Sequence, residues 1–202
     1  MPRLDYFNEG ESAAQKSFAN RRDKIFAPIV KALIALGVKP LHVSIFGVAL
    51  CTLVIFISPD YWMAIAILLV LYILADGIDG PLARATNGGS NGGALVDIFS
   101  DQVGVFIVAL AAVTWLEVTP QAHFVFAFFY ILCVFSMVIV NAIGQNVINT
   151  VRLKYFYFLL YVVSCSTRYD FLIDWFAIVF SIYYIIMFLL QFRVIIIGVD
   201  EE

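Results

Sequence analysis

The chain has 202 residues and a formal net charge of −3, and 63% of its residues are hydrophobic while only 13% are charged. Soluble domains normally contain about 45–50% apolar and about 25% charged residues, so the composition excludes an ordinary soluble enzyme and indicates an integral membrane protein. The Lys and Arg residues form no basic stripe interleaved with aromatic side chains, so the sequence predicts no nucleic-acid partner.

The N-terminal segment, residues 1–41, is the most polar part of the chain, and we expect it to precede a transmembrane domain over residues 42–202. Residues 21–37 read RRDKIFAPIVKALIALG, with basic residues at the start. Apolar residues at helical spacing form one face: Ile25, Phe26, Ile29, Val30, Leu33 and Ile34. This pattern predicts an amphipathic helix that lies on the membrane surface. The alternative is a short seventh buried helix.

Six apolar segments follow, and each is close to the length of about 20 residues that a helix needs to cross a bilayer. They cover residues 42–58, 61–83, 94–116, 121–143, 145–166 and 171–193. We therefore predict an all-α polytopic membrane protein with six transmembrane helices, preceded by the amphipathic interfacial helix.

The distribution of basic residues predicts the orientation, because Lys and Arg concentrate in cytoplasmic loops. With the N-terminus in the cytoplasm, eleven of the twelve basic residues fall on the cytoplasmic side and only Arg168 falls on the other. The loop between the second and third spans then lies at the cytoplasmic face, and we expect the chain to reside in the cytoplasmic membrane of a prokaryote.

Four aspartates flank that loop in two pairs. Asp76 and Asp79 are three residues apart, and Asp97 and Asp101 are four apart, so each pair shares one face of a helix. The sequence between them is rich in glycine, at Gly88, Gly89, Gly92 and Gly93. A tight turn there would make an antiparallel helical hairpin, and the four carboxylates could then converge on one point.

Converging carboxylates repel each other and are costly to desolvate unless some are protonated or a cation is bound. Oxygen ligands without a nearby His or Cys favour a hard divalent ion, either Mg²⁺ or Mn²⁺, and four carboxylates are enough to hold two ions. A pair of metal ions suits in-line displacement at phosphorus, and Arg84 adds a planar cation that suits phosphate. Taken singly, each residue is more simply a helix cap or a turn former; together they indicate a functional site, because ionisable clusters in membranes are usually functional.

The spacing of these residues resembles the signature of the CDP-alcohol phosphotransferase family, D-x2-D-G-x2-A-R-x8-G-x3-D-x3-D. All eight positions are met over 26 residues, by Asp76, Asp79, Gly80, Ala83, Arg84, Gly93, Asp97 and Asp101. Family members often carry a Pro-Asn-x-x-Thr element at the start of the first span. Here Pro40 matches, Leu41 replaces the Asn, and Ser44 could supply the hydroxyl of the Thr.

The resemblance implies a transfer of a phosphatidyl-type group from a CDP-linked lipid, such as CDP-diacylglycerol, to a small polar alcohol, with release of CMP. It implies metal ligation by the four aspartates Asp76, Asp79, Asp97 and Asp101. It also implies that Asp101 is the general base for the acceptor hydroxyl. The residues implied to line the CDP moiety are Asp76, Gly80, Ala83 and Arg84, and the family further implies a homodimer.

The acceptor is less well defined by the sequence. Arg152 and Lys154 precede the fifth span and Arg193 ends the sixth, so all three lie on the predicted cytoplasmic side and could bind a phosphorylated acceptor. They fit equally well as anchoring residues that snorkel at helix ends. Our first expectation is glycerol 3-phosphate, because it is a common acceptor in the family, followed by inositol phosphate and then serine.

Two other functional classes also use clustered acids. A membrane prenyltransferase also holds Mg²⁺ and a diphosphate with aspartates, but typically carries two separate Asp-rich motifs and more spans. A transporter also uses intramembrane acids, but these would be expected deeper in the spans than acids that adjoin a glycine-rich turn.

Overall fold

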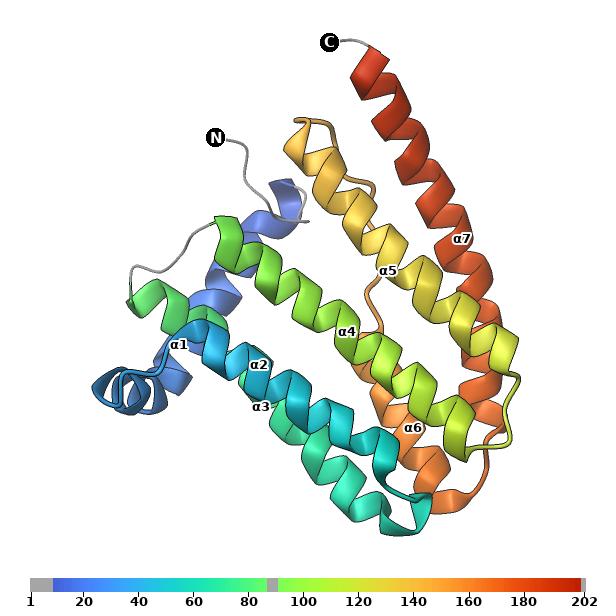
Figure 1. Cartoon of the computed structure of the whole chain (residues 1–202). Helices are drawn as coiled ribbons and strands as arrows, with labels where there is room; N and C mark the ends of the chain where they lie inside the picture. The colour runs from blue at the N-terminus through green and yellow to red at the C-terminus, as the bar shows by residue number, and fades with distance from the viewer. Residues whose placement is uncertain (1–8, 87–90, 201–202) are drawn as a thin grey trace.

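The computed structural model describes residues 9–86 and 91–200, and the glycine-rich residues 87–90 of the predicted turn lie outside these ranges. Within them the chain is helical and contains no strand, so the all-α class is confirmed for the described residues. The α-helices are α1 (Glu9–Ala35), α2 (Pro40–Leu53), α3 (Trp62–Ala85), α4 (Asn91–Trp115), α5 (Pro120–Ala142), α6 (Lys154–Thr167) and α7 (Phe171–Asp200), and two short 3-10 helices, Val54–Phe56 and Pro59–Tyr61, join α2 to α3 (Figure 1).

Four stretches of the described chain are long and apolar enough to cross a membrane: Pro59–Ala85, Leu95–Trp115, Pro120–Ala142 and Phe171–Gly198. The segments Ala19–Ala35 and Pro40–Phe56 meet at an angle of 107° and give a fifth candidate if they are counted as one broken span. The predicted number of six is therefore not reached by length alone. The reason is that α2 and α6 have 14 residues each, or about 21 Å at 1.5 Å per residue, against a hydrocarbon core of about 30 Å.

The late start of α6 is the largest departure from the predicted spans. Helix α5 ends at a left-handed glycine, Gly144, whose φ is +72°, and the amide of Gln145 donates to the carbonyl of Val140 across the helix end. The chain then runs without helix to Lys154, where the sequence predicted a span from residue 145. Figure 1 shows this irregular segment running from the end of α5 along the bundle to the start of α6.

Polar side chains of α7 hold the irregular segment in place. The amide of Gln191 donates to the carbonyl of Ile148 at 2.9 Å, and the hydroxyl of Tyr184 donates to the carbonyl of Val151 at 2.8 Å. Gln191 and Tyr184 are both buried. Backbone groups inside a membrane protein must find hydrogen-bond partners within the protein. These two side chains therefore donate the hydrogen bonds that backbone amides would have donated to the same carbonyls in a helix.

Helix α1 packs its apolar face on α3, beside the predicted motif. Val30 is buried, and Phe26 and Leu33 pack with it against residues of α3 that include Ala75 and Leu82. The remaining apolar residues that were predicted for this face, Ile25, Ile29 and Ile34, are exposed. The helix therefore presents two apolar stripes, one on the bundle and one directed outwards.

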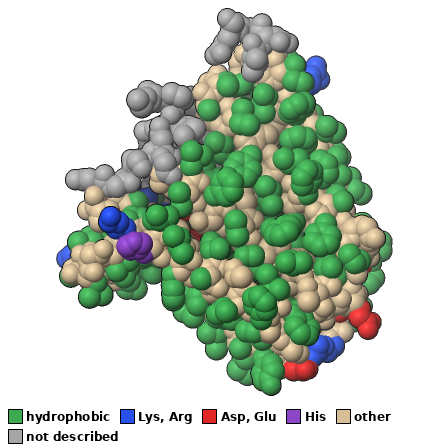
Figure 2. Space-filling model, viewed as in Figure 1, with side chains coloured by type: hydrophobic (Ala, Val, Ile, Leu, Met, Phe, Trp, Pro, Cys, Tyr) green, Lys and Arg blue, Asp and Glu red, His purple; other side chains and the backbone are tan. Residues whose placement is uncertain are grey.

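Small residues let α4 occupy the middle of the bundle, where it contacts α2, α3, α5 and α6 (Figure 1). Val108, Ala109, Ala111 and Ala112 are fully buried there. Much of the outside is apolar, and Figure 2 shows hydrophobic side chains over most of the visible face, with charged side chains near its ends. This distribution fits a protein that is surrounded by lipid tails.

Candidate active site

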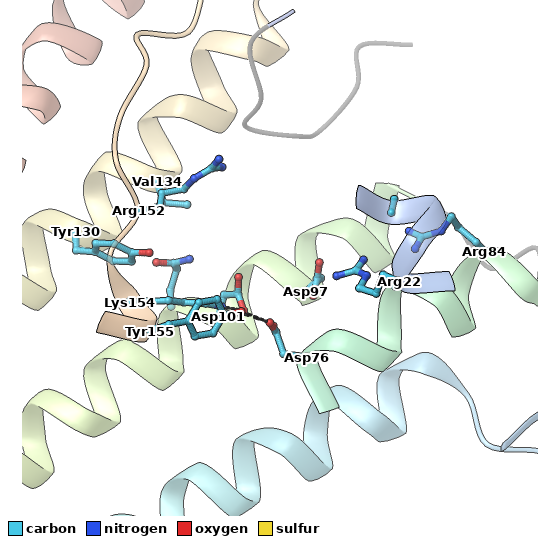
Figure 3. A pocket seen from close by; sticks show the side chains of 13 residues that line it. Arg22, Asp76, Arg84, Asp97, Asp101, Tyr130, Val134, Arg152, Lys154 and Tyr155 are labelled. Atoms are coloured by element: carbon cyan, nitrogen blue, oxygen red, sulfur yellow. Dashed lines mark hydrogen bonds and ion pairs between the residues drawn. The ribbon is translucent and has the colours of Figure 1, made fainter. Parts of the chain in front are cut away.

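A pocket of about 440 Å³ opens where α1, α3, α4 and α5 meet the start of α6 (Figure 3). Three of the four predicted acids line it: Asp76, Asp97 and Asp101. Four basic residues line it as well: Arg22, Arg84, Arg152 and Lys154. The pocket thus joins the predicted motif to two of the three residues that were predicted for the acceptor.

Lys154 lies between two of the acids. Its ammonium forms salt bridges with Asp101 and, at 3.6 Å, with an oxygen of Asp76. The hydroxyl of the next residue, Tyr155, donates to Asp76 at 2.6 Å. The Lys154 side chain is only 7% exposed, and a buried charge of this kind is tolerated because it is paired. The site therefore carries its own organic cation between two signature aspartates.

Asp79 has different surroundings from the other three acids. It is buried outside the pocket lining, and it accepts a hydrogen bond of 2.9 Å from the hydroxyl of Ser44 on α2. Ser44 is the residue that was predicted to supply the Thr hydroxyl of the family element. Although Leu41 departs from that element, Ser44 contacts the motif.

The four carboxylates are brought to one end of the bundle, but they are not disposed as a ready metal site. Among the described residues, no three acidic, histidine or cysteine side chains are grouped closely enough to hold an ion. The donor set still suits a hard divalent cation, because it is made of carboxylate oxygens alone. The predicted ligation by Asp76, Asp79, Asp97 and Asp101 therefore stays a prediction.

Arg84 and Gly80 of the motif both contact α1. The guanidinium of Arg84 donates two hydrogen bonds to the carboxylate of Asp23, one of them from Nε at 3.0 Å. Gly80 lies directly under Arg22, because a Cβ built on this glycine would fall 2.6 Å from a terminal nitrogen of Arg22. Ala83, the remaining residue predicted to touch CDP, is half-buried and does not line the pocket.

The predicted acceptor residues divide into two groups. Arg152 and Lys154 line the pocket, whereas Arg193 is exposed on α7 and does not. Arg22 and Tyr155 line it too and were not predicted. Tyr155 could have been found as the neighbour of Lys154. Nothing in the sequence of α1 shows that Arg22, rather than the adjacent Arg21, turns towards the motif.

Comparison with known proteins agrees with the motif. The CDP-alcohol phosphatidyltransferase family matches residues 40–199, which is most of the chain. This chain belongs to the CDP-alcohol phosphatidyltransferase family, as the signature predicted.

Two curated relatives share part of the chain. The phosphatidylinositol phosphate synthase of Mycolicibacterium smegmatis is 33% identical over 95 residues, which are 46% of this chain and 42% of that protein. The phosphatidylinositol phosphate synthase of Mycobacteroides abscessus is 34% identical over 96 residues, which are 46% of this chain and 43% of that protein. The match thus spans less than half the length of each relative. No solved structure matches the chain significantly.

Proposed function

We propose that this protein transfers a phosphatidyl group from a CDP-linked lipid, such as CDP-diacylglycerol, to inositol phosphate and releases CMP. The observation that carries the proposal is the shared pocket, in which the signature acids Asp76, Asp97 and Asp101 face the basic residues Arg152 and Lys154. Family membership supports the donor. A membrane prenyltransferase or a transporter would explain neither the family match nor the intact signature.

The relatives favour inositol phosphate over the acceptor that was first expected, glycerol 3-phosphate. Both are named phosphatidylinositol phosphate synthases, and that product consists of a phosphatidyl group joined to inositol phosphate. The pocket agrees with a phosphorylated acceptor, because a guanidinium and an ammonium reach the wall that the motif lines. Serine, the third expectation, carries no phosphate that would need two basic residues.

The proposed chemistry is an in-line displacement. A hydroxyl oxygen of the acceptor forms a bond to the lipid-side phosphorus of the donor, the bond from that phosphorus to the bridging oxygen breaks, and CMP leaves. Asp101 takes the hydroxyl proton. A phosphate bound by Lys154 would draw its ammonium away from Asp101, and the carboxylate would then become a stronger base because its compensating charge is gone.

The aspartates Asp76, Asp79, Asp97 and Asp101 would hold one or two Mg²⁺ or Mn²⁺ ions, which would neutralise charge on the diphosphate. We further propose the arrangement in the membrane: six crossings, with α2 and α6 completed by flanking residues, α1 at the interface, and the pocket at the cytoplasmic face. The family's homodimer is part of the proposal and is tested by the mass of the purified protein in detergent.

The proposal is tested by incubating the purified full chain with CDP-diacylglycerol and Mg²⁺ or Mn²⁺, and with inositol phosphate, glycerol 3-phosphate or serine in separate reactions. We expect release of CMP and a phosphatidylinositol phosphate product with inositol phosphate alone. A chelator should stop the reaction, and added metal should restore it. Turnover with glycerol 3-phosphate alone would overturn the acceptor, and no turnover with any acceptor would overturn the donor.

A further inference from the structure

Arg22 stands outside the part of the chain that matches the family, residues 40–199, yet its side chain lines the pocket. It belongs to α1, which packs on the motif helix α3 through Phe26 and Val30. In Figure 3 the guanidinium of Arg22 points into the pocket beside Asp97, while Arg84 lies to the right, farther from Asp97. The packing of α1 therefore brings a second guanidinium to the motif.

The two guanidiniums differ in what they contact. Arg84 donates both its hydrogen bonds to Asp23. Arg22 forms no salt bridge with any carboxylate in the part of the chain that the structure describes, and its Nε is buried without a hydrogen-bond partner. An unsatisfied buried donor on a charged group costs free energy that a ligand anion can recover.

Gly80 makes this position possible. A side chain at residue 80 would meet the Arg22 guanidinium at 2.6 Å, so only glycine leaves the nitrogen where it lies. Arg84 is the next nearest group, with a terminal nitrogen 3.5 Å from the same built Cβ. The signature glycine thus marks the point where two guanidiniums from separate helices approach one stretch of backbone.

We propose that Arg22 binds the diphosphate of a nucleoside diphosphate donor at this point. The inference rests on the proposed function, because that function supplies the donor. A guanidinium presents a planar set of N–H donors that matches two phosphate oxygens, and it is always charged. Asp23 is a positioning residue in this arrangement, because it holds the guanidinium of Arg84 beside Gly80. Arg22 is then the guanidinium that binds the anion.

The test measures CDP binding to the purified full chain in the presence of Mg²⁺, together with the melting temperature of each sample. Arg22→Gln should raise the Kd for CDP by about tenfold to a hundredfold, as expected for the loss of a charge-assisted hydrogen bond. Arg22→Lys, which keeps the charge but loses the planar fork, should fall between. Arg21→Gln is the matched control, because Arg21 is the adjacent arginine and is exposed; it should bind CDP like the wild type.

A second arm tests the role of Gly80. Gly80→Ala must displace the Arg22 guanidinium, so the Gly80→Ala, Arg22→Gln double variant should bind CDP little more weakly than Arg22→Gln alone. Fully additive losses would show that the alanine acts on CDP directly, at the CDP-lining position that the signature implies for Gly80, and not by displacing Arg22.

The outcomes separate the inference from the proposed function. A wild-type protein that releases CMP while Arg22→Gln and Arg22→Lys bind CDP normally would overturn the role of Arg22 alone. An equal loss in Arg21→Gln would also overturn it, because the effect would then follow the charge of α1 rather than the pocket. A wild-type protein that neither binds CDP nor releases CMP would overturn the proposed function. If Arg22→Gln fails to fold, the CDP affinity of Arg22→Lys decides the question.

Discussion

At the scale of single residues, the aspartates of the signature lie in two different surroundings. Asp79 is fixed by a hydroxyl from α2, whereas Asp76 and Asp101 share the ammonium of Lys154. The first is a hydrogen bond from a hydroxyl, and the second is a pair of salt bridges between side chains that are only 7–15% exposed. A change at Lys154 or Asp101 therefore alters the charge balance of the pocket itself.

Replacement of the proposed base should remove turnover without removing the fold. We expect Asp101→Asn to lower kcat by about 10²–10⁴-fold, the usual contribution of a general base, while the Kd for CDP rises much less, because Asp76, Asp79 and Asp97 remain to hold the metal. CMP release and CDP binding are measured on the same preparation. Glu117→Gln, at an exposed acid outside the pocket, is the control. Turnover of Asp101→Asn close to the wild-type value would refute its role as base.

Removal of the buried ammonium should destabilise the protein in a way that a divalent ion can repair. Lys154→Met leaves Asp76 and Asp101 without their cation, and breaking a buried pair in this way costs about 3–5 kcal/mol. We expect a lower melting temperature without metal and a larger rise on adding Mg²⁺ than the wild type shows, because Mg²⁺ no longer competes with the ammonium.

Lys154→Arg keeps the charge and controls for a change of side-chain shape at this position. It should melt closer to the wild type and gain less from Mg²⁺ than Lys154→Met. If Lys154→Met is as stable as the wild type in the presence of a chelator, then the Lys154 ammonium does not compensate the negative charges of Asp76 and Asp101.

At the scale of elements, local spacing predicted the motif well and predicted the fifth span poorly. The acids of α3 and α4 were found because helical spacing is a local property, and each acid lies on its predicted helix. The start of α6 was missed because it depends on a distant residue. Gln191 reaches back 43 positions to the carbonyl of Ile148, and no local pattern in residues 145–153 records that contact. Arg22 was missed for the same reason, since its position depends on Gly80.

The contact made by Gln191 gives a prediction for the irregular segment. Gln191→Leu keeps the size of the buried side chain but leaves the carbonyl of Ile148 without this donor, at a cost of about 1–3 kcal/mol. The segment delivers Arg152 and Lys154 to the pocket, so we expect a lower melting temperature and a higher KM for inositol phosphate. The KM for the CDP-linked donor should change little, because the residues proposed to bind the donor lie on α1 and α3 and not on the irregular segment.

Leu190→Met, at the neighbouring and exposed position of α7, is the control and should change neither KM. Equal rises in both KM values for Gln191→Leu would indicate a general loss of structure rather than a displaced acceptor wall.

At the scale of the whole molecule, two helices of the bundle, α2 and α6, have only 14 residues each and are shorter than the hydrocarbon core of a bilayer. A short helix can cross if flanking residues complete the span or if the bilayer thins around it, at a modest cost per ångström. The 3-10 helix Val54–Phe56 extends α2 at one end. Irregular backbone is tolerated at membrane depth where protein groups satisfy it, as the side chains of Tyr184 and Gln191 do for the segment 145–153.

The crossing of α2 can be tested with single cysteines, because Cys51, Cys133 and Cys165 are all buried and should react slowly. Leu36 and Tyr61 lie on either side of α2, and they are 77% and 68% exposed. In sealed inside-out vesicles, whose cytoplasmic face is outward, a membrane-impermeant maleimide should label Leu36→Cys at once and Tyr61→Cys only after detergent is added. In right-side-out vesicles the order should reverse. Labelling of both cysteines from the same side would mean that α2 enters the membrane and returns without crossing it. The side of the membrane on which the pocket lies would then depend on the orientation of α3 and α4 alone.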